Sequence, residues 1–504
     1  MINHLQNRIG KLIGAFRERS GMTQAQLAKI VGTSQSAIAR MEDGEQNFTV
    51  EMLGKISGAL KRDIMTLSKG TVDFEIEGGR KLHGTVVTKT SKNAAVGLLC
   101  ASLLNKGTTT LKSMPKIEEV KRLIEVLTSI GVEIRWAGDD LEIRPPKKLA
   151  LEKLNVVSAI KTRSIIMFIG PLIHQLKSFS LPQVGGCKLG SRTVRPHFFA
   201  LEKLGVQIEA HSDSFTVSHT KLKPNYIVLY ESGDTVTENV LMAAALIPGT
   251  TTIKFASANY QVQDMCHFLQ LLGVRIEGIG TTTLVIHGVA SIDKAITYHP
   301  SEDPIESMFF IAAAAVTNSS IVIKRCPIDF LELELLKLEK MGWKFKLSPR
   351  YKARNDHAEL VDITTLPSKL VALEEKIDSR PFPGMNIDNL PFFAVIATQA
   401  EGRTLIHDWV YEKRAIYYTE LDKLGANTVL ADSHRVFIQG KTDLKAAQVV
   451  CPPALRPATI ILIGMLAARG TSILRNVYSI NRGYEDLANR LNELGAKIKV
   501  LREA

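Results

Sequence analysis

Six times along this chain an apolar helical pattern ends in Leu-x-x-Leu-Gly or a close variant, and a short extended segment follows. The six glycines stand 68 to 83 residues apart, at Gly131, Gly205, Gly273, Gly342, Gly425 and Gly495. A second short motif, rich in Gly, Thr and Ser, leads each copy and begins at Gly107, Lys177, Gly249, Asn318, Gly402 and Gly470. Because self-similarity at a regular period determines architecture, this repeat limits the possible folds more than any single motif.

Each copy has the pattern of an amphipathic helix, a turn and a strand. In the first copy Val120, Leu123, Leu127 and Ile130 recur at i+3 and i+4, so one helix face packs on a core. The glycine then stands where a helix C-terminus favours a left-handed residue. A period of about 70 residues is too long for a simple solenoid. We therefore expect six small α/β modules packed into one or two globular domains.

Length and composition narrow the class of protein further. A chain of 504 residues, 45% of them hydrophobic, holds two to four domains with ample core. No apolar run is long enough to span a membrane, and the first residues lack the apolar stretch of a signal peptide. We therefore expect a cytoplasmic protein with no membrane partner. The net charge of +12 suits nucleic acid, phosphorylated metabolites, or both.

The cysteines are odd in number and scattered. Such spacing fits reduced thiols and does not fit a disulfide framework or a zinc site. The five cysteines are Cys100, Cys187, Cys266, Cys326 and Cys451.

The first seventy residues stand outside the sixfold pattern and are predicted to be all helical. Thr23 is a plausible N-cap for the second helix, and Gly32 ends that helix. Ala28, Ile38 and Met41 are expected to pack the second and third helices together. The four predicted helices cover residues 7–20, 23–31, 34–42 and 49–60.

The run from Met22 to Gly44 resembles the central motif of the Cro/repressor-type (XRE-like) helix-turn-helix family. The resemblance implies that residues 1–70 form a DNA-binding domain whose third helix enters a major groove. Gln35 and Arg40 would then contact base edges, while Gln24 and Ser36 would hold phosphates. The alternative is a helical bundle that serves protein contacts.

A glycine-rich segment, from Gln183 to His197, lies between two repeat units. Its glycines allow close backbone approach, and Cys187 stands beside Lys188 and Arg192. Because neighbouring cations lower a thiol pKa, this segment could be a lid that carries a reactive thiolate next to an anion site. The alternative is a surface turn in which the cysteine occurs by chance.

Five stretches together identify a family resemblance that covers the chain from about residue 71 to its end. The chain resembles the enolpyruvyl transferase superfamily, and within it the branch that acts on UDP-N-acetylglucosamine in peptidoglycan (cell-wall) precursor synthesis. The stretches are Thr90-Ser-Lys-Asn-Ala-Ala, Gly185-Gly-Cys-Lys-Leu-Gly-Ser-Arg, Thr237-Glu-Asn-Val-Leu-Met-Ala-Ala, Phe382-Pro and Asn481-Arg-Gly-Tyr-Glu.

The resemblance implies an α/β fold of two inside-out domains, three units each, hinged around a cleft. One domain would comprise residues 71–91 plus 302–504, and the other residues 92–301 with the Cys187 lid. No cofactor and no metal are implied.

The same resemblance assigns roles to individual residues. Cys187 would be the acid that protonates the enol carbon or a transient nucleophile, Asp388 the base, and Lys92 a further catalytic group. The phosphate of phosphoenolpyruvate would be bound by cationic side chains, which suit a phosphate leaving group. These side chains are Lys92, Arg192, Arg456 and Arg482. The acceptor would be bound by Asn93, Arg163, Asp388, Val410 and Arg414.

Two departures from the family pattern concern the acceptor. Three extra residues precede Asp388, which predicts that this carboxylate is displaced. Arg195 stands where the family carries an acid beside the uracil. The leading hypothesis is transfer of the enolpyruvyl group to the 3′-hydroxyl of UDP-N-acetylglucosamine. The alternatives are the same reaction on another nucleotide or sugar nucleotide, and a DNA-binding regulator whose transferase-like body senses a ligand.

Overall fold

The computed structural model describes residues 10, 13, 14, 16–18, 20–46, 50–60, 72–183 and 193–502. The chain divides into two compact units, a small one at Met1–Thr71 with Arg502–Ala504 and a large one at Val72–Leu501. Most of the predicted helix 7–20, and all of residues 184–192 with Cys187 and Arg192, lie outside the described residues. Within the described ranges, no helix has both the length and the apolar character needed to cross a membrane.

The small unit is helical, as predicted. Thr23 caps the first of its described helices and forms a capping box with Gln26, and Gly32 ends that helix with a φ of 74°. Ala28, Ile38 and Met41 are buried in its core, so the predicted packing of the second and third helices is confirmed. The described helices are α2 (Gln24–Val31), α3 (Gln35–Glu42) and α4 (Val50–Leu60).

The large unit contains six β-sheets, in line with the six copies of the repeat. In five sheets, the strand that follows the Gly/Thr/Ser motif has a parallel neighbour on one side and an antiparallel neighbour on the other. The sheet in the second copy has three strands among the described residues.

Three sheets come from the middle of the chain. They are β13-β3-β5-β4 (Ile296–Tyr298, Thr109–Leu111, Asp140–Arg144, Glu133–Ala137), β6-β8-β7 (Ser178–Pro182, Ser214–His219, Val206–Ala210) and β11-β12-β10-β9 (Arg275–Glu277, Thr283–Gly288, Gly249–Lys254, Tyr226–Val228).

The other three sheets combine residues 72–87 with residues 322–502. They are β23-β24-β1-β25 (Gln448–Val450, Gly470–Arg475, Val72–Gly78, Ile498–Arg502), β15-β17-β14-β2 (Lys344–Leu347, Glu359–Leu366, Val322–Pro327, Thr85–Val87) with β16 (Tyr351–Lys352) on β17, and β18-β20-β22-β21 (Leu370–Val371, Ala400–His407, Arg435–Gly440, Asn427–Leu430) with β19 (Ile377–Asp378) on β20.

In each copy, one helix ends shortly before the repeat glycine. All six glycines have a positive φ, between 84° and 102°, which confirms the predicted left-handed helix ends. Five of these helices are α-helices, and the helix of the fifth copy is a 3₁₀-helix. They are α6 (Glu118–Ser129), α9 (Arg195–Glu202), α11 (Tyr260–Leu271), α13 (Glu332–Lys340), η5 (Ala415–Leu424) and α17 (Leu487–Glu493).

A second set of helices is largely buried, because these helices are apolar on most of their surface. They are α5 (Lys92–Ala101), α8 (Ile169–Leu172), α10 (Asp234–Ala245), α12 (Pro304–Val316), α14 (Leu390–Ala397) and α15 (Leu455–Ala467). Short connecting helices are η1 (Ser102–Leu104), η2 (Leu151–Lys153), α7 (Val156–Ala159), η3 (Arg163–Phe168), η4 (Ile328–Phe330) and α16 (Tyr478–Asn481).

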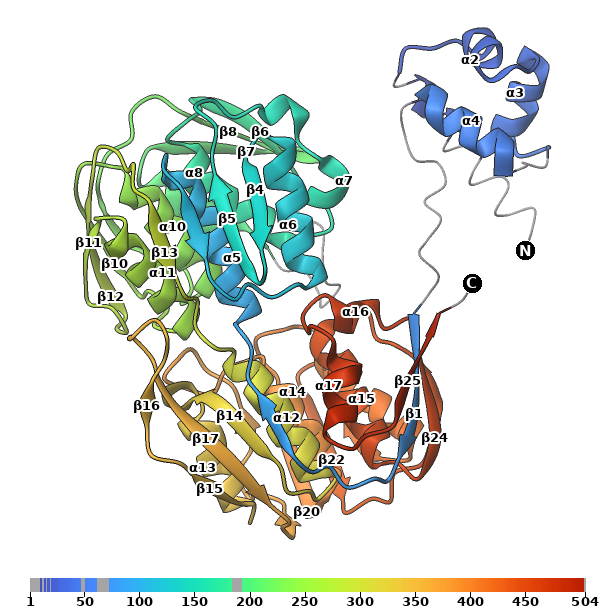
Figure 1. The fold of residues 1–504 in the computed structure, drawn as a ribbon, viewed down its shortest axis with the longest axis vertical. Coiled ribbons are helices and arrows are strands. Elements are labelled where there is room, and N and C mark those ends of the chain that lie inside the picture. Colours follow the sequence, from blue (N-terminus) through green and yellow to red (C-terminus); the bar gives the residue numbers. More distant parts are fainter. Residues whose placement is uncertain are drawn as a thin grey trace. The chain divides into compact units, whose positions relative to one another are not determined.

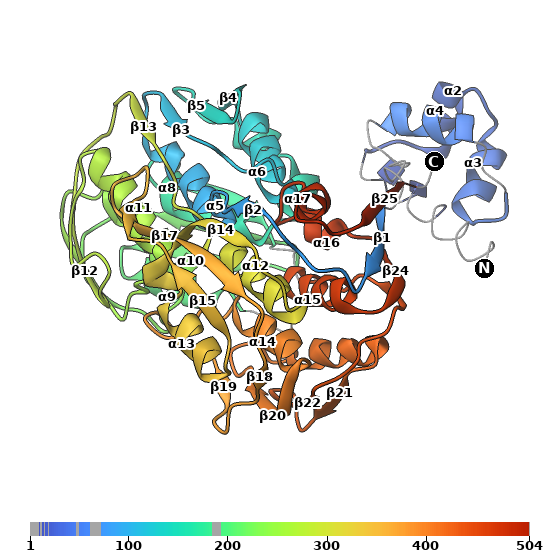
Figure 2. The ribbon, with the colours of Figure 1, turned by 60° about the horizontal axis from the view of Figure 1, so that its bottom comes forward.

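The buried apolar side chains of the large unit form two separate clusters. One uses residues from Ala95 to Tyr298, which we name the middle lobe. The other uses Phe74–Val86 and Ile305–Ile498, which we name the terminal lobe. Figure 1 shows the middle lobe in cyan and green and the terminal lobe mostly in yellow to red, and Figure 2 shows the same division from another side.

The chain passes between the lobes twice, and the two passages lie side by side. Ser91 donates from its backbone N to the carbonyl of Ser301 at 2.8 Å, and Asp303 donates to the carbonyl of Lys89 at 2.9 Å. The paired residues stand next to the boundaries expected at residues 91/92 and 301/302, which stay a prediction. The expected α/β fold of repeated units is confirmed.

Candidate active site

Five charged side chains from both lobes gather where the two passages meet. Lys92 is the first residue of α5, whose N-cap is Ser91. The backbone N of Lys92 donates to Oδ2 of Asp303 at 3.3 Å, and Asp303 in turn caps the N-terminus of α12. The start of α5 in the middle lobe is therefore fixed to the start of α12 in the terminal lobe.

An ion pair joins the two lobes directly. Nη2 of Arg482, which directly follows α16, donates to Oε2 of Glu119 at 2.7 Å. Glu119 is buried in the first turn of α6, and its other oxygen accepts from Oγ1 of Thr162 at 2.6 Å. Arg482 is thus held by a carboxylate of the opposite lobe.

Glu119 was not predicted as a site residue. Glu118 and Glu119 together have the pattern of acidic residues at a helix N-terminus, where they stabilise the macrodipole. Glu119 stands between Ile117 and Val120, two apolar residues on the helix face expected to pack on the core, and this was the sequence signal of its burial.

Asp388 and Arg456 form the second ion pair of the site. Nη2 of Arg456, in the first turn of α15, lies 3.2 Å from Oδ2 of Asp388. Nη1 of Arg456 donates to the hydroxyl of Tyr484 at 2.9 Å. Arg456 is buried, so its guanidinium has a fixed direction.

The pKa values show that Lys92 belongs to this cluster. Burial lowers the pKa of Lys92, while the carboxylates of Glu119 and Asp388 oppose that change. Burial acts to raise the pKa of Asp388, but Arg456 and Lys92 hold it below its usual value. Similarly, burial acts to raise the pKa of Glu119, and Lys92 and Arg482 lower it. Three cations therefore surround two ionised carboxylates, as in a site built for an anionic ligand.

The inserted segment before Asp388 is firmly held. The backbone N of Asn386 and the side chain of Asn389 both donate to Oε1 of the buried Glu334, at 3.2 and 2.8 Å. Oδ1 of Asn386 accepts from the backbone N of Asp388 at 2.9 Å. These contacts orient Asp388 toward Arg456, so the three extra residues do not remove this carboxylate from the charged cluster.

Arg414 supports the same segment from behind. Its guanidinium is fully buried, pairs with Asp408 and donates from Nη2 to the carbonyl of Ile387 at 2.9 Å. Tyr418 also donates to Asp408. The predicted acceptor contact of Arg414 stays a prediction, and its observed contacts give it a role in positioning Asp388.

The remaining predicted acceptor residues lie at three places. Asn93 is half-buried in the first turn of α5, next to Lys92, and Val410 is exposed in the loop before η5. Nη2 of Arg163 donates to the carbonyl of Thr193 at 3.0 Å, at the edge of residues 184–192. Arg163 therefore connects Thr193 to the helix η3, next to the Thr162 contact with Glu119.

The predicted DNA-contacting residues lie on the helices α2 and α3 of the small unit. Gln35, Ser36 and Arg40 are exposed on α3, as expected for residues that point away from the core. Gln24 accepts from Nε2 of Gln35 at 3.3 Å and donates to Oε2 of Glu42 at 2.9 Å.

A largely buried ion pair connects the end of α3 to Arg17. Nε of Arg17 lies 2.6 Å from Oε1 of Glu42. The side chains at the start of α2 and α3 therefore have a defined geometry relative to one another.

In the part of the chain that the structure describes, no group of three or more His, Cys, Asp or Glu side chains is placed to hold a metal ion. Cys100, Cys266, Cys326 and Cys451 are buried thiols.

Comparison with known proteins assigns both units. Residues 76–491 match the family model of EPSP synthase (3-phosphoshikimate 1-carboxyvinyltransferase), and residues 13–67 match a helix-turn-helix model. The chain is 32% identical over 435 residues to UDP-N-acetylglucosamine 1-carboxyvinyltransferase of Bradyrhizobium diazoefficiens, covering 85% of this chain and 98% of that protein. It is 33% identical over 429 residues to the enzyme of that name from Treponema denticola, covering 85% of this chain and 99% of that protein.

Solved structures agree on the fold. The enolpyruvyl transferase NikO from Streptomyces tendae superposes with a TM-score of 0.74 at 23% identity, over 86% of this chain and 100% of that chain. EPSP synthase from Acinetobacter baumannii gives a TM-score of 0.67 at 17% identity, over 86% of this chain and all of that chain. Residues 72–501 carry the charged cluster on this fold, and residues 13–67 carry the helix-turn-helix. The chain therefore belongs to the enolpyruvyl transferase family and has an N-terminal helix-turn-helix domain.

Proposed function

We propose that the chain transfers the enolpyruvyl group of phosphoenolpyruvate to the 3′-hydroxyl of UDP-N-acetylglucosamine and releases phosphate. The observation that carries this proposal is the cluster of Lys92, Arg456 and Arg482 around Asp388 and Glu119. The names of the relatives above supply the donor and the acceptor class.

The proposed reaction proceeds by addition and then elimination. The acceptor oxygen bonds to C2 of phosphoenolpyruvate while Asp388 accepts the hydroxyl proton and Cys187 donates a proton to C3. C2 then carries both the phosphate and the acceptor oxygen. Loss of a proton from C3 restores the double bond and expels phosphate with the electrons of the C2–O bond. The alternative role of Cys187 is that of a transient nucleophile at C2.

The cationic side chains supply electrostatic stabilisation in this scheme. Lys92, Arg192, Arg456 and Arg482 bind the phosphate of the donor, where negative charge grows as the C2–O bond breaks. Arg482 must first exchange its contact with Glu119 for one with phosphate, and that exchange couples donor binding to the junction of the lobes.

Acceptor binding is assigned to Asn93, Arg163, Asp388 and Val410. The structure gives Arg414 a supporting position behind Ile387. Arg195 is exposed at the start of α9, where its charge favours a more anionic acceptor than the family pattern does. The same reaction on another nucleotide or sugar nucleotide is therefore the second candidate function.

A coupled assay of phosphate release from phosphoenolpyruvate tests the acceptor. The panel consists of UDP-N-acetylglucosamine, other UDP-sugars, UDP and UMP, each at equal concentration. Fastest turnover with UDP-N-acetylglucosamine supports the proposal, and fastest turnover with another nucleotide supports the second candidate. Release with none of them contradicts both and favours a regulator that senses a ligand.

A phosphonate epoxide that mimics phosphoenolpyruvate is expected to alkylate Cys187 selectively. Burial raises the pKa of the thiols of Cys326 and Cys451 to about 12, and it raises the pKa of Cys100 and Cys266 as well. Those four thiols are therefore protonated and shielded at neutral pH. Peptide mapping by mass spectrometry should find one adduct, on Cys187, whose formation phosphoenolpyruvate slows. An adduct on another cysteine, or none, contradicts the assigned role.

The small unit is proposed to bind DNA through Gln24, Gln35, Ser36 and Arg40. Removal of residues 1–70 is expected to abolish DNA binding and to leave kcat and KM unchanged, because the large unit has its own cores and contains the whole charged cluster. Gel-shift and phosphate-release assays on the truncated and full chains check this. A loss of turnover on truncation would show that the two units are coupled.

A further inference from the structure

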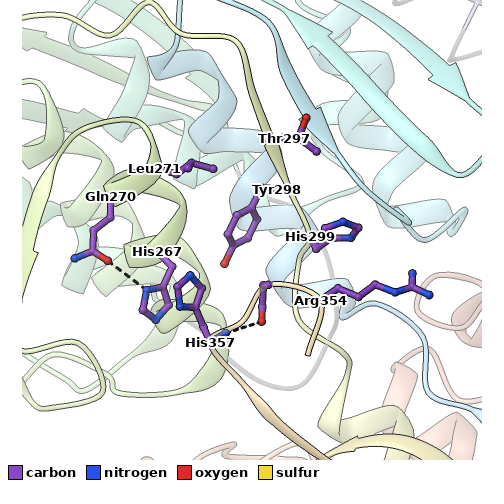
Figure 3. Close-up of a pocket in the computed structure, with 9 residues that line it drawn as sticks. His267, Gln270, Leu271, Thr297, Tyr298, His299, Arg354 and His357 are labelled. Carbon is purple, nitrogen blue, oxygen red and sulfur yellow. Dashed lines mark hydrogen bonds between the residues drawn. The ribbon is translucent and has the colours of Figure 1, made fainter. Parts of the chain in front are cut away.

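A hollow of about 310 Å³ lies between the two lobes, and none of its lining residues belongs to the charged cluster of the candidate active site. Its volume is at the lower end of the roughly 300–1,000 Å³ of small-molecule sites. Figure 3 shows the side chains around it. The lining residues are His267, Gln270, Leu271, Thr297, Tyr298, His299, Arg354, Asn355 and His357.

The hollow is closed on one side by the tip of the β16–β17 hairpin, which reaches from the terminal lobe onto the middle lobe. Nη1 of Arg354 donates to Oγ of Ser113 at 3.3 Å, and Nδ2 of Asn355 donates to Oγ of Ser301 at 3.0 Å. Ala353, Ala358 and Leu360 form a small apolar cluster of their own beneath the tip. The tip is thus a compact arm that contacts the passage between the lobes.

The rings of His267 and His357 form a wall of the hollow. They are stacked with their centroids 3.6 Å apart and an angle of 4° between the ring planes. Figure 3 shows the two rings face to face, one from α11 and one from the hairpin tip. Two imidazolium ions at this distance would repel, so the stack is built from neutral rings or from one neutral and one charged ring.

The lining combines one permanent cation with imidazole groups. Arg354 is permanently charged, and His267, His299 and His357 line the same hollow. Among the described residues, none of those lining the hollow is Asp or Glu, and the nearest acid behind the lining is the buried Asp264, which accepts from the hydroxyl of Tyr298 at 2.8 Å and from Nδ2 of Asn355 at 3.4 Å. Gln270 and Thr297 add neutral polar groups. This is the composition of a site for a small oxyanion, in which an arginine supplies a fixed pair of donors.

The surroundings lower the pKa of all three histidines, so their rings lose the proton more readily than a free imidazole does. Burial lowers the pKa of His267 to about 4, with His357 adding to the effect. Burial lowers the pKa of His299, and Arg354 lowers it further. Burial also lowers the pKa of His357.

Charged groups on the neighbouring elements also act on the pKa of these rings. Lys112 and Lys352 act in the same direction as burial, while the acids act against it without reversing it. The acids are Asp140 and Glu302 near His299 and Asp356 near His357.

We propose that this hollow is a second ligand site, which binds a small dianion of the phosphate or phosphomonoester class between Arg354 and His299 and so fastens the hairpin tip to the middle lobe. A bound dianion raises the pKa of nearby histidines, so binding takes up protons. Affinity therefore increases as the pH falls from 8 to 6. This site is distinct from the one proposed for the phosphate of the enolpyruvyl donor.

Sulfate is the appropriate probe, because its charge stays at −2 throughout this pH range and only the protein titrates. Calorimetry and the C2-proton signals of ¹³C-labelled histidine are recorded on the full chain, at constant ionic strength, at pH 8 and pH 6. Sulfate is expected to shift the signals of His299 and His357 and to bind more tightly at pH 6. Phosphate and glycerol phosphate at pH 8 test whether phosphomonoesters bind as well as inorganic phosphate.

The Arg354→Ala variant should lose about tenfold or more of this affinity, because a hydrogen-bonded charge contact is removed. Arg350→Ala is the matched control, since Arg350 lies on the same hairpin, is similarly accessible and pairs with Asp329 and Glu332 instead. His299→Gln should retain binding at pH 8 but lose the increase at pH 6. Equal affinity in the Arg354→Ala variant and the parent, or equal affinity at both pH values in the parent, would overturn the proposal.

Discussion

Replacement of Asp388 by asparagine is expected to lower kcat by roughly 10²–10⁴-fold, the range typical of a lost general base. The amide keeps the size of the side chain and cannot accept the proton of the acceptor hydroxyl. The backbone around residue 388 should keep its place, because Glu334 and Asn386 hold it through contacts that do not involve the Asp388 side chain. Steady-state phosphate release with saturating acceptor measures the change.

The appropriate control is Asp432→Asn. Asp432 also pairs with an arginine, Arg435, but this pair is exposed and lies in a turn next to β22. Its replacement should leave kcat within twofold of the parent. A similar kcat in the Asp388→Asn variant and in the parent would show that another group accepts the proton.

The pH dependence of this reaction follows from the same contacts. Arg456 and Lys92 hold the pKa of Asp388 below its usual value of 3.8 against the effect of burial. Asp388 therefore remains ionised as the pH falls from 8 to 5, and it does not cause any loss of activity in that range. The stability that its pair with Arg456 contributes is fully present well above the usual pKa of 3.8, and it is lost as the pH falls from there through the lowered pKa.

Replacement of Arg414 by methionine is expected to destabilise the terminal lobe by about 3–5 kcal/mol, because it leaves Asp408 buried without its partner. Both side chains of this pair are fully buried. Removal of one partner leaves the desolvation cost of the other uncompensated. The variant should melt roughly 6–20 °C lower in scanning calorimetry, in the transition that involves the terminal lobe.

A surface pair provides the contrast. Arg435→Met removes a comparable contact with Asp432, whose side chain is 37% exposed, and should cost no more than about 1 kcal/mol. The double variant Arg414→Met/Asp408→Asn should recover part of the loss, since no buried charge remains. A melting temperature of Arg414→Met equal to that of the parent would contradict the account of this pair.

The Arg414→Met replacement is also expected to affect turnover in the molecules that remain folded. Arg414 donates to the carbonyl of Ile387, one residue before Asp388. Without that contact the inserted segment is less well held, and kcat should fall while the KM for phosphoenolpyruvate changes little. This separates a positioning role from direct contact with the donor.

The helix ends were predictable because their causes are local. Gly131 and the five equivalent glycines adopt the left-handed conformation that the Leu-x-x-Leu-Gly pattern favours. Thr23 was predictable as a cap for the same reason, since the residues that decide it lie within one helical turn. The number of repeat units followed from spacing alone.

Contacts between distant segments could not be derived in this way. Glu334 binds Asn386, in the segment before Asp388, from 52 residues earlier in the chain, and the Glu119–Arg482 pair joins residues far apart in sequence. His267 and His357 meet only because the β16–β17 hairpin crosses to the other lobe. For Cys187 and Arg192 the family resemblance remains the basis of the assignment.

The pairing of β1 with β24 has a consequence for synthesis on the ribosome. The middle lobe has all its residues once about 300 have been made, whereas β1 and β2 form sheets with strands made later. At a synthesis rate of about 5–20 residues per second, roughly 20–80 s pass between the synthesis of β1 and that of β24. During that interval its apolar residues, Phe74 and Ile76, lack their final neighbours, so the nascent chain has a defined period in which a chaperone can bind it.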